Sequence, residues 1–402
     1  MTKVLYTTPV LQHPPICGPH ISVENAIKAL GSISELHIIS RVSKKNFGGS
    51  IAQKLYEKYS KVFLLAPSVD NLSKNKYINK IQLKWIDFLN KDAKFIINYC
   101  EEHSIKIIWC DRGLELSFRL ICTLKKLRPD IMIVNDTCAV YSEFILRGAK
   151  YENDITKKTK IIDRGRKKQG EEKKLVQVAD VTTVVSEFDA KYFRSISDDN
   201  AKIKQFSNVI DIDLYKEKIP CEIKKPYIYF AGWFGKDSPT DHGIRWFIDN
   251  VFEYIKQEVP GVTLCIAGRG SLETLSDIKD DNIEVIGERP SLYSYLSNSD
   301  VVITPLWFES GTRFKILEAG AASKPVVSTI LGAEGIKITN EKDILISDEP
   351  KEFAKYVIKV LIDLEYGKQL GGNLNKLIKN KYCVDYLSKE ASEVINYLKG
   401  KK

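Results

Sequence analysis

The sequence predicts an α/β protein of two domains, each built around a parallel sheet. Short apolar runs of strand length alternate with helical patterns from one end of the chain to the other, which is typical of parallel strands joined by helices. With 402 residues the chain is too long for one ordinary hydrophobic core. A polar segment with two prolines divides it near the middle, so we expect two domains.

Each half of the chain contains a set of strand candidates that resembles a Rossmann-type sheet on its own. In the first half the apolar runs cover residues 4–7, 36–40, 62–66, 107–110, 131–135 and 181–185. In the second half they cover residues 227–231, 262–267, 283–286, 301–304, 326–328 and 344–347.

The domain boundaries follow from the polar segment "FSNVIDIDLYKEKIPCEIKKP", residues 206–226. We expect a first domain over residues 1–207, a linker over 208–224 and a second domain over 225–385. Residues 386–402 are expected to form a C-terminal helix, because their apolar residues recur at helical spacing on one face. These residues are Leu387, Ala391, Val394, Ile395 and Leu398.

Composition excludes several classes of protein. The chain is 44% hydrophobic and 28% charged, and no apolar run reaches the roughly 20 residues that a membrane span needs. The N-terminus shows no signal-peptide pattern. Eight cysteines are scattered singly with no C-x-x-C pair, which indicates reduced thiols rather than disulfides or a zinc site. We therefore expect a cytoplasmic protein.

The net charge of +9 is unevenly spread along the chain. Residues 144–174 hold 11 Lys and Arg against 5 Asp and Glu. This stretch is either a solvated helical face or a patch that attracts anionic lipid head groups or a phosphorylated substrate. The second interpretation includes peripheral contact with the inner face of a membrane. Nucleic acid is not expected as a partner, because the stretch has no interleaved aromatic residues and no binding motif accompanies it.

Small residues and cations follow three strands of the second domain. Gly268, Arg269 and Gly270 follow one strand, and the next strand is followed by Gly287, Glu288 and Arg289. The strand at 301–304 leads into "FESGTRFKILEAGAASKPVVST", residues 308–329. Because the ends of parallel strands share one edge of the sheet, these groups predict a binding edge for a phosphorylated ligand. The G-x-G-x-x-G fingerprint of NAD enzymes is missing, so a dehydrogenase is a poorer alternative.

The first turn of the second domain, "FAGWFGKDSPTDHGIRWF", adds two expectations. Gly232 follows the strand and lets the backbone approach a ligand closely. Ser238, Pro239 and Asp241 predict the capped start of a helix. His242 lies in that helix and is expected to be a packing residue.

Taken together, these motifs resemble the donor-binding domain of GT-B glycosyltransferases of the large retaining group known as family 4. The segments on which this resemblance depends are "IAGRGS", "VIGERPSLYSYLSNSDVVITPL", "SGTRFKILEAGAASKPVVSTILGAEGI" and the linker "NVIDIDLY". The resemblance covers most of the chain. It implies two Rossmann-like domains that face each other across a cleft, with the C-terminal helix as the segment that can cross back to the first domain.

The resemblance also implies roles for single residues in donor binding. Glu318 would accept the ribose hydroxyls, the backbone of residues 287–289 would lie near the base, and Gly232 would face the phosphates. The "SGTR" turn, which runs into the helical pattern that contains Glu318, would supply N–H groups and a cation to the diphosphate. The residues of this region are Ser310, Gly311, Thr312, Arg313 and Lys315, and the planar fork of the arginine suits phosphate oxygens. Arg269, Glu288 and Arg289 complete the predicted donor-binding set.

The sequence departs from the family pattern at three places. The family often has two glutamates around this turn. The position of the first is occupied here by Ser310, and Glu309 stands one place earlier, so the sequence does not decide which carboxylate contacts the sugar. Of an Arg and Lys pair after the first strand of this domain, only Lys236 is present. In "VNDTCAVYSE" a second acid is replaced by Ala139, which leaves Asp136 to orient a hydroxyl or to serve as a strand-end residue. Gly18 and His20 are the acceptor-side candidates of the first domain.

These observations predict a retaining glycosyltransferase that moves a hexose-type unit from a UDP- or GDP-sugar to a hydroxyl of a glycan or lipid-linked acceptor. The predicted catalytic residues are Arg313 and Lys315, which stabilise the leaving diphosphate, and Asp136. No cofactor or metal is expected, because the D-x-D sequence at Asp211 and Asp213 lies in the linker rather than at a strand end. The alternative is a two-domain nucleotide-sugar or glycan-binding protein without transferase activity.

Overall fold

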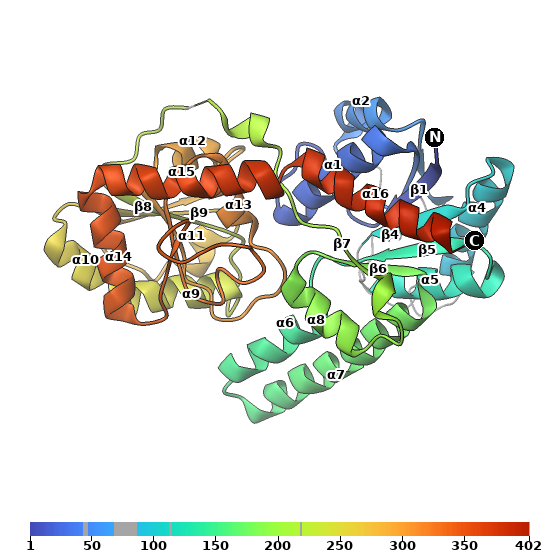
Figure 1. The fold of residues 1–402 in the computed structure, drawn as a ribbon. Helices are drawn as coiled ribbons and strands as arrows, with labels where there is room; N and C mark the ends of the chain where they lie inside the picture. The colour runs from blue at the N-terminus through green and yellow to red at the C-terminus, as the bar shows by residue number, and fades with distance from the viewer. Residues whose placement is uncertain (43–46, 68–86, 112–114, 218, 402) are drawn as a thin grey trace. The chain divides into compact units, whose positions relative to one another are not determined.

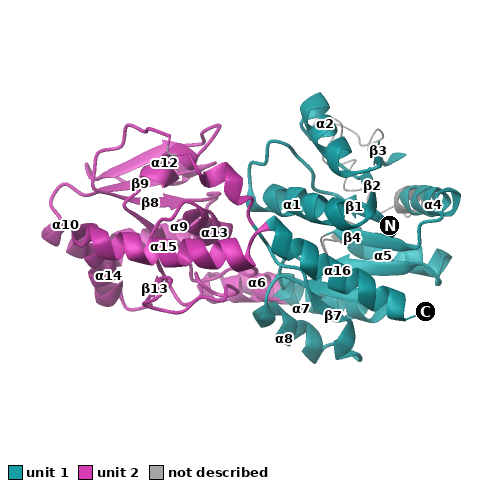
Figure 2. Ribbon diagram, turned by 45° about the horizontal axis from the view of Figure 1, so that its top comes forward, with its two compact units in different colours: residues 1–142, 163–209, 384–402 teal, residues 143–162, 210–383 magenta. Residues whose placement is uncertain are grey.

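The computed structural model describes residues 1–42, 47–67, 87–111, 115–217 and 219–401. Contacts divide the described chain into two compact units (Figure 2). Unit 1 consists of residues 1–142, 163–209 and 384–402, and unit 2 consists of residues 143–162 and 210–383. Two segments therefore leave the linear order of the sequence: residues 143–162 belong to unit 2, and the C-terminal segment belongs to unit 1.

Unit 1 contains a parallel sheet of seven described strands in the order β3-β2-β1-β4-β5-β6-β7. Figure 1 labels β1, β4, β5, β6 and β7 of this sheet. The strands are β1 (Lys3–Thr8), β2 (Glu35–Ser40), β3 (Val62–Leu65), β4 (Ile107–Asp111), β5 (Met132–Asp136), β6 (Val181–Val184) and β7 (Ile203–Gln205). The described helices that follow or cover them are α1 (Gly18–Ile33), α2 (Gly49–Tyr59), α4 (Asp87–Glu102), α5 (Glu115–Leu127), α6 (Tyr141–Gly148), α7 (Ile155–Val178), α8 (Glu187–Ser195) and α16 (Val384–Gly400). Helices α6 and α7 contribute residues to both units.

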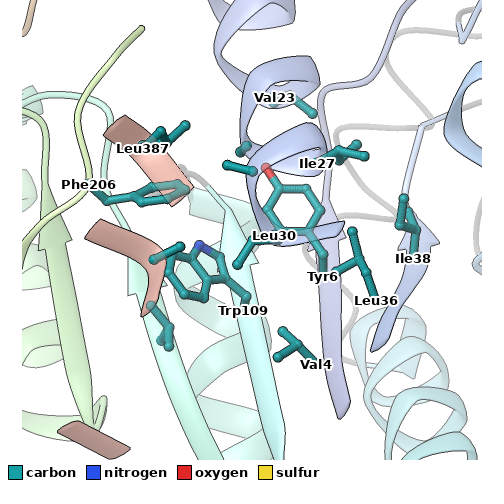
Figure 3. Packing of buried hydrophobic residues seen from close by; sticks show 14 of the residues in the cluster. Val4, Tyr6, Val23, Ile27, Leu30, Leu36, Ile38, Trp109, Phe206 and Leu387 are labelled. Carbon is teal, nitrogen blue, oxygen red and sulfur yellow. The ribbon is translucent and has the colours of Figure 1, made fainter. Parts of the chain in front are cut away.

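The core of unit 1 is built where α1 and α16 cover the sheet. Figure 3 shows Tyr6 of β1 and Trp109 of β4 among aliphatic side chains of α1, with Leu387 of α16 beside Phe206. The rings of Trp109 and Phe206 lie 4.8 Å apart. The face predicted for the C-terminal helix is the buried face of α16, which explains why this helix belongs to unit 1.

Unit 2 contains a second parallel sheet, with six described strands in the order β10-β9-β8-β11-β12-β13. The strands are β8 (Tyr227–Ala231), β9 (Thr263–Ala267), β10 (Ile283–Gly287), β11 (Val301–Thr304), β12 (Val326–Ser328) and β13 (Leu345–Ile346). The helices are α9 (Pro239–Phe247), which continues through a π-turn (Ile248–Phe252) into α10 (Glu253–Glu258), then α11 (Ser271–Thr274), α12 (Tyr293–Asn298), α13 (Phe314–Ala321), α14 (Pro350–Ile362) and α15 (Leu364–Lys381). A 3₁₀ turn, η4 (Ile212–Tyr215), precedes the sheet.

The prediction of an α/β protein with two Rossmann-like parallel sheets is confirmed. The twelve predicted strands are all present among the described residues, and their ends differ by at most one residue. Central strands such as β4 and β9 are buried along their whole length, because helices cover both faces of a parallel sheet. The prediction missed β7, which has three residues and alternates Lys204 with less polar neighbours.

Candidate functional site

The strand order of unit 2 reverses between β8 and β11, which are hydrogen-bonded neighbours at the centre of the sheet. In open α/β sheets, ligands bind beyond the carboxyl ends of the strands at such a reversal. The loops after β8 and β11 flank this point, and they carry Gly232 and the turn that precedes α13. The site is therefore built from these loops.

Three glycine turns form one continuous edge beyond β8, β9 and β10. The N–H of Gly232 donates to the carbonyl of Ala267 at 3.0 Å, and the N–H of Gly268 donates to the carbonyl of Gly287 at 2.9 Å. Gly268 has φ +124°, and a Cβ there would lie 1.9 Å from the carbonyl oxygen of Gly232. Only glycine fits, so the turns approach each other backbone to backbone. The glycine turns that the sequence places after these strands are thus neighbours at one edge of the unit 2 sheet, and ligand binding at this edge stays a prediction.

The charged side chains predicted for this edge lie outside it. Arg269, Glu288 and Arg289 are exposed, and the one hydrogen bond recorded for Arg289 is to the carbonyl of Glu288. Their backbone lies in the glycine edge, while their side chains extend into solvent. We therefore retain a backbone role for this edge.

Helix α9 starts as the sequence predicts. The Ser238 hydroxyl accepts the N–H of Asp241 at 3.3 Å, with Pro239 as the first helical residue. Asp241 in turn accepts from the N–H of Asp237 at 3.0 Å. This cap fixes the loop after β8, on which Gly232 stands, to the start of the helix.

The turn before α13 has the features of an anion site. Gly311 has φ +78°, a left-handed conformation that favours glycine. Helix α13 begins after Arg313 with no side-chain cap and no acid in its first turn. In the described part of the chain, the N–H groups of Gly311 and Thr312 have no recorded hydrogen-bond acceptor. Free N–H groups at a helix N-terminus attract phosphate, which the helix dipole reinforces.

Lys315 provides the cation of this turn. Its side chain is half-buried, and Nζ lies 4.6 Å from the ring centre of Phe230. A Cβ on Gly232 would lie 3.6 Å from Nζ, so the ammonium group faces the glycine turn after β8. Among the described residues, Nζ has no recorded hydrogen bond or ion pair. Burial lowers the pKa of Lys315 to about 8, and the nearby Glu309 opposes this shift. An ammonium group in this position is stabilised by a bound anion.

The lowered pKa of Lys315 predicts a pH dependence of donor binding. The ammonium form predominates below pH 8 and is lost above it, so binding of an anionic donor weakens as the pH rises. If donor binding requires the ammonium form, KM for a nucleotide-sugar should rise about tenfold between pH 7 and pH 9. The pH profile of the initial rate measures this. The Lys315→Arg variant is the control, because a guanidinium stays charged throughout and should flatten the profile.

Glu318 lies one turn further along α13 and is held by a residue from the linker. Its Oε1 accepts a hydrogen bond from the Tyr215 hydroxyl at 2.9 Å. Burial raises the pKa of Glu318, which the hydrogen bond from Tyr215 and the charge of Lys315 oppose. The tyrosine engages one carboxylate oxygen, which leaves Oε2 for a ligand. Sequence reasoning singled out Glu318 but missed Tyr215, because the linker motif carries no sign of which side chain turns inward.

Arg313 occupies a different position from the one its motif suggested. Its side chain is 4% exposed, and its terminal nitrogens donate to the carbonyls of Gly311 and Leu331, the latter at 3.1 Å. The sequence prediction gave this guanidinium to the diphosphate. Because those nitrogens already bond to carbonyl oxygens, the structure favours a role in fixing the turn, with Lys315 as the cation that faces the ligand.

Several buried polar atoms around the loop after β11 have no hydrogen-bond partner among the described residues. They are Oγ1 of Thr304, Nε1 of Trp307, Oγ1 of Thr312 and Nδ1 of His242. An unsatisfied buried polar group costs about 1–3 kcal/mol, so such a group in a native structure requires an explanation. A bound polar ligand would supply the missing partners. The ring of His242 packs against two aromatic rings, as expected for a packing residue. Its centre lies 4.5 Å from the ring centre of Tyr151 and 5.8 Å from that of Phe308.

Glu309 is oriented by contacts that the sequence did not suggest. Its Oε1 accepts the N–H of Ser310 at 3.3 Å, and its carbonyl accepts a hydrogen bond from Arg147 at 2.7 Å. Arg147 belongs to the 143–162 segment of unit 2 and also donates to both carboxylate oxygens of Glu334, at 2.7 and 3.2 Å. Tyr151 of the same segment donates to the carbonyl of Trp307 at 3.2 Å. The segment therefore supports the loop after β11.

Replacing Arg147 by methionine should loosen this loop. The variant loses a hydrogen bond to the carbonyl of Glu309 and two ion pairs, one with Glu143 and one with Glu334. The pair with Glu334 is mostly shielded from solvent, with side chains 19% and 17% exposed. We expect KM for the donor to rise about five- to tenfold, or about 1–1.5 kcal/mol, which is the contribution of one typical hydrogen bond, because the loop is loosened while the donor's own contacts remain. Lys150→Met removes an exposed charge three residues away and is the matched control. Equal KM values for the two variants would contradict this role.

The unit 1 candidates are placed as follows. Asp136 at the end of β5 is 6% exposed, and its two oxygens accept from Trp109 Nε1 at 2.9 Å and Thr183 Oγ1 at 2.5 Å. These bonds favour the strand-end role over the predicted catalytic one. Gly18 is the first residue of α1, and His20 Nδ1 lies 3.3 Å from Cys17 Sγ.

Sequence reasoning missed a second histidine in the loop after β1. Nδ1 of His13 lies 2.8 Å from the Glu24 carboxylate, which also pairs with Lys28 at 2.9 Å. Glu24 and Lys28 are one helical turn apart on α1, a spacing that signals an ion pair. His13 lies 11 residues before Glu24, and no local pattern connects the two.

The linker aspartates have a structural explanation. Asp211 caps η4 by accepting the N–H of Asp213 at 3.3 Å, and Asp213 pairs with Lys216 at 2.6 Å. In the described ranges, no group of three or more His, Cys, Asp or Glu side chains gathers as metal ligands do. Within the same ranges, no helix is long and apolar enough to cross a membrane.

Comparison with known proteins identifies a domain of the chain. Residues 225–363 match the family model described as Glycosyl transferases group 1. An uncharacterized 44.6 kDa protein from the cps region of Klebsiella pneumoniae is 26% identical over 149 residues, which cover 35% of this chain and 38% of that protein. An uncharacterized glycosyltransferase of Methanocaldococcus jannaschii is 23% identical over 295 residues, 65% of this chain and 70% of that protein.

Solved structures share the fold over the whole chain. A sucrose-phosphate synthase from Thermosynechococcus elongatus superposes with a TM-score of 0.71 at 16% identity, covering 100% of both chains. The Anabaena protein HepE, solved with UDP and glucose, superposes with a TM-score of 0.66 at 13% identity, covering 98% of this chain and 100% of that one. These structures confirm the predicted GT-B fold. The family match assigns residues 225–363 to a domain of the kind described as Glycosyl transferases group 1.

Proposed function

We propose that the chain transfers a sugar from a UDP- or GDP-type nucleotide-sugar to a hydroxyl of a glycan or lipid-linked acceptor. The family match of residues 225–363, in unit 2, to glycosyl transferases group 1 supports this proposal. The observation that carries the proposal is Lys315. Its ammonium group faces Gly232 at the N-terminal end of α13, without an ion-pair partner among the described residues. A diphosphate is an anion of the right kind for this position, since the free N–H groups beside it also attract phosphate.

The donor is expected to lie along the edge of the unit 2 sheet. The diphosphate would bind the N–H groups of Gly311 and Thr312 and the ammonium of Lys315. Glu318 would accept the ribose hydroxyls through Oε2, and the base would approach the backbone of residues 287–289. Support comes from the placement of these groups on neighbouring strand ends of one sheet. HepE, which shares the fold, is solved with UDP and glucose.

The proposed reaction proceeds with retention at the anomeric carbon, as the family resemblance suggests. The bond between that carbon and the diphosphate oxygen breaks, and a bond to the acceptor oxygen forms on the same face. The acceptor proton passes to the leaving phosphate. The main task of the protein is to stabilise the charge that develops on the diphosphate, which Lys315 and the free N–H groups can do. Proton NMR of the first product formed distinguishes the α and β anomers and tests retention.

We propose that turnover does not require a divalent metal, because Lys315 and the helix N-terminus supply positive charge to the diphosphate. The test is the reaction rate after EDTA treatment and dialysis. The proposal predicts full activity. Loss of turnover that manganese or magnesium restores would contradict it.

The proposal for the acceptor is based on the positive charge of residues 144–174. Many lysines and arginines of the basic 144–174 stretch are exposed along α7, which suits an acidic glycan or a lipid-linked acceptor at the cytoplasmic face of a membrane. Flotation with vesicles that contain anionic lipid separates these alternatives. Binding at low salt supports the membrane-proximal acceptor, and no binding leaves the soluble glycan.

The decisive test of the function is incubation with a panel of UDP-, GDP- and dTDP-sugars, followed by detection of the free nucleoside diphosphate. Release from at least one donor, increased by a hydroxyl acceptor, supports the transferase. Tight binding of a nucleotide-sugar without release by the whole panel would instead support the non-catalytic binding protein.

A further inference from the structure

Unit 2 contains a cavity at the end of α13 opposite the proposed diphosphate turn. It lies among η4, α12, the C-terminal end of α13 and α15, and its volume is about 430 Å³. Small-molecule sites in proteins commonly measure about 300–1,000 Å³. The cavity is therefore large enough for a ligand of sugar size.

The charged residues that line the cavity are all positive. Lys216 follows η4, Lys324 lies between α13 and β12, and Lys379 belongs to α15, and the lining contributed by the described residues contains no aspartate or glutamate. Lys216 pairs with the exposed Asp213 at 2.6 Å, and Lys324 donates to the carbonyl of Ser299 at 2.8 Å. Lys379 is exposed and has no recorded hydrogen bond or ion pair within the described chain. The three lysines belong to three different elements, and their positive charges attract an anionic ligand.

The end of α13 does not need these lysines. The side-chain amide of Asn375 donates to the carbonyls of Gly320 and Ala321 at 2.8 and 3.0 Å. These are the last carbonyls of the helix, which a C-terminal lysine would otherwise satisfy. With that task taken by an amide, the end of α13 does not need Lys379 as a capping residue.

Two tyrosines line the same cavity. The rings of Tyr215 and Tyr293 meet edge to face, with centres 5.2 Å apart. Aromatic walls accept the C–H face of a sugar ring, and lysines accept a phosphate.

We propose that this cavity binds a small phosphorylated sugar, and that its occupant controls donor binding through Tyr215. The ring of Tyr215 lines the cavity, while its hydroxyl donates to Glu318 on the donor side at 2.9 Å. A ligand that fixes the ring also fixes the hydrogen bond and the orientation of the carboxylate. This second half of the proposal rests on the proposed role of Glu318 in donor binding; the first half does not.

Binding is tested without a donor by isothermal titration of the full chain with the 6-phosphates of glucose, mannose and N-acetylglucosamine, with glucose and with inorganic phosphate. At least one sugar phosphate should bind more tightly than both glucose and phosphate. Lys379→Glu should weaken that binding tenfold or more, whereas Lys376→Glu, an exposed lysine of the same helix outside the cavity lining, should not. Lack of binding by all three sugar phosphates at millimolar concentration, equal effects of the two variants, or displacement by saturating UDP would overturn the site.

Coupling is tested by titrating UDP and GDP with and without the bound sugar phosphate. Nucleotide affinity should change by about fivefold or more, as is usual for two coupled sites. Tyr215→Phe keeps the ring and should retain sugar-phosphate binding, but the effect on the nucleotide should disappear. Unchanged nucleotide affinity in the wild type would overturn the coupling. If the transferase proposal fails while the sugar phosphate binds, the site stands by itself, so the two failures are distinguishable.

Discussion

Replacing Lys315 by methionine is expected to lower kcat/KM for the nucleotide-sugar by about 100- to 1,000-fold, or about 2.7–4 kcal/mol. The ammonium of Lys315 lies beside Gly232 and over the ring of Phe230, with no ion-pair partner in the described ranges, so a diphosphate would be its main partner. Methionine has a similar length and no charge. The loss should therefore arise from the missing charge rather than from a cavity.

The stability of the same variant separates this account from a structural role. Burial opposes the charged form of Lys315, so its removal should leave the melting temperature unchanged or raise it. Lys355→Met removes an exposed lysine of α14 and should change neither quantity. A large fall in melting temperature that accompanies the loss of activity would show that Lys315 holds the fold together instead.

Replacing Glu318 by alanine is expected to raise KM for the donor by about 10- to 100-fold, with a smaller effect on kcat. The carboxylate has one oxygen on Tyr215, and the other is proposed to accept ribose hydroxyls. Hydrogen bonds to charged groups contribute about 1.5–3 kcal/mol each, which corresponds to this range.

A ribose-specific control sharpens the Glu318 prediction. The wild type should bind UDP or GDP more tightly than the corresponding 2′-deoxynucleotide, because the deoxy compound lacks a hydroxyl that can donate a hydrogen bond to the carboxylate. In Glu318→Ala this preference should vanish, since its acceptor is gone. A variant that retains the full preference would show that another group binds the ribose.

The predicted strands and the start of α9 could be derived from local pattern alone. Parallel strands buried on both faces appear as short apolar runs, and a serine, proline and aspartate at fixed spacing form a helix start. The same reasoning placed Glu318 early in the helix that follows the "SGTR" turn, whereas Lys315, which was expected in that turn, lies in the helix, α13. These features depend on residues that are close in sequence.

The features that the sequence did not predict depend on distant partners. Arg313 stands in the expected motif, but its two terminal nitrogens donate hydrogen bonds to the carbonyls of Gly311 and Leu331. Leu331 is 18 residues away in the sequence. Arg147 counted as one charge in a basic stretch, whereas the structure places it on Glu334, 187 residues later. Neither contact has a local pattern, so each requires the three-dimensional structure.

The central claim is that the turn before α13 binds a nucleoside diphosphate through Lys315. Isothermal titration of the protein with UDP and with uridine, and likewise with GDP and with guanosine, gives the two affinities for each base. Their ratio measures the contribution of the diphosphate to binding in the wild type and in Lys315→Met. The account predicts that for at least one base the diphosphate strengthens wild-type binding by about 100-fold or more, and that most of this gain is lost in the variant. An equal gain in both proteins would contradict the account.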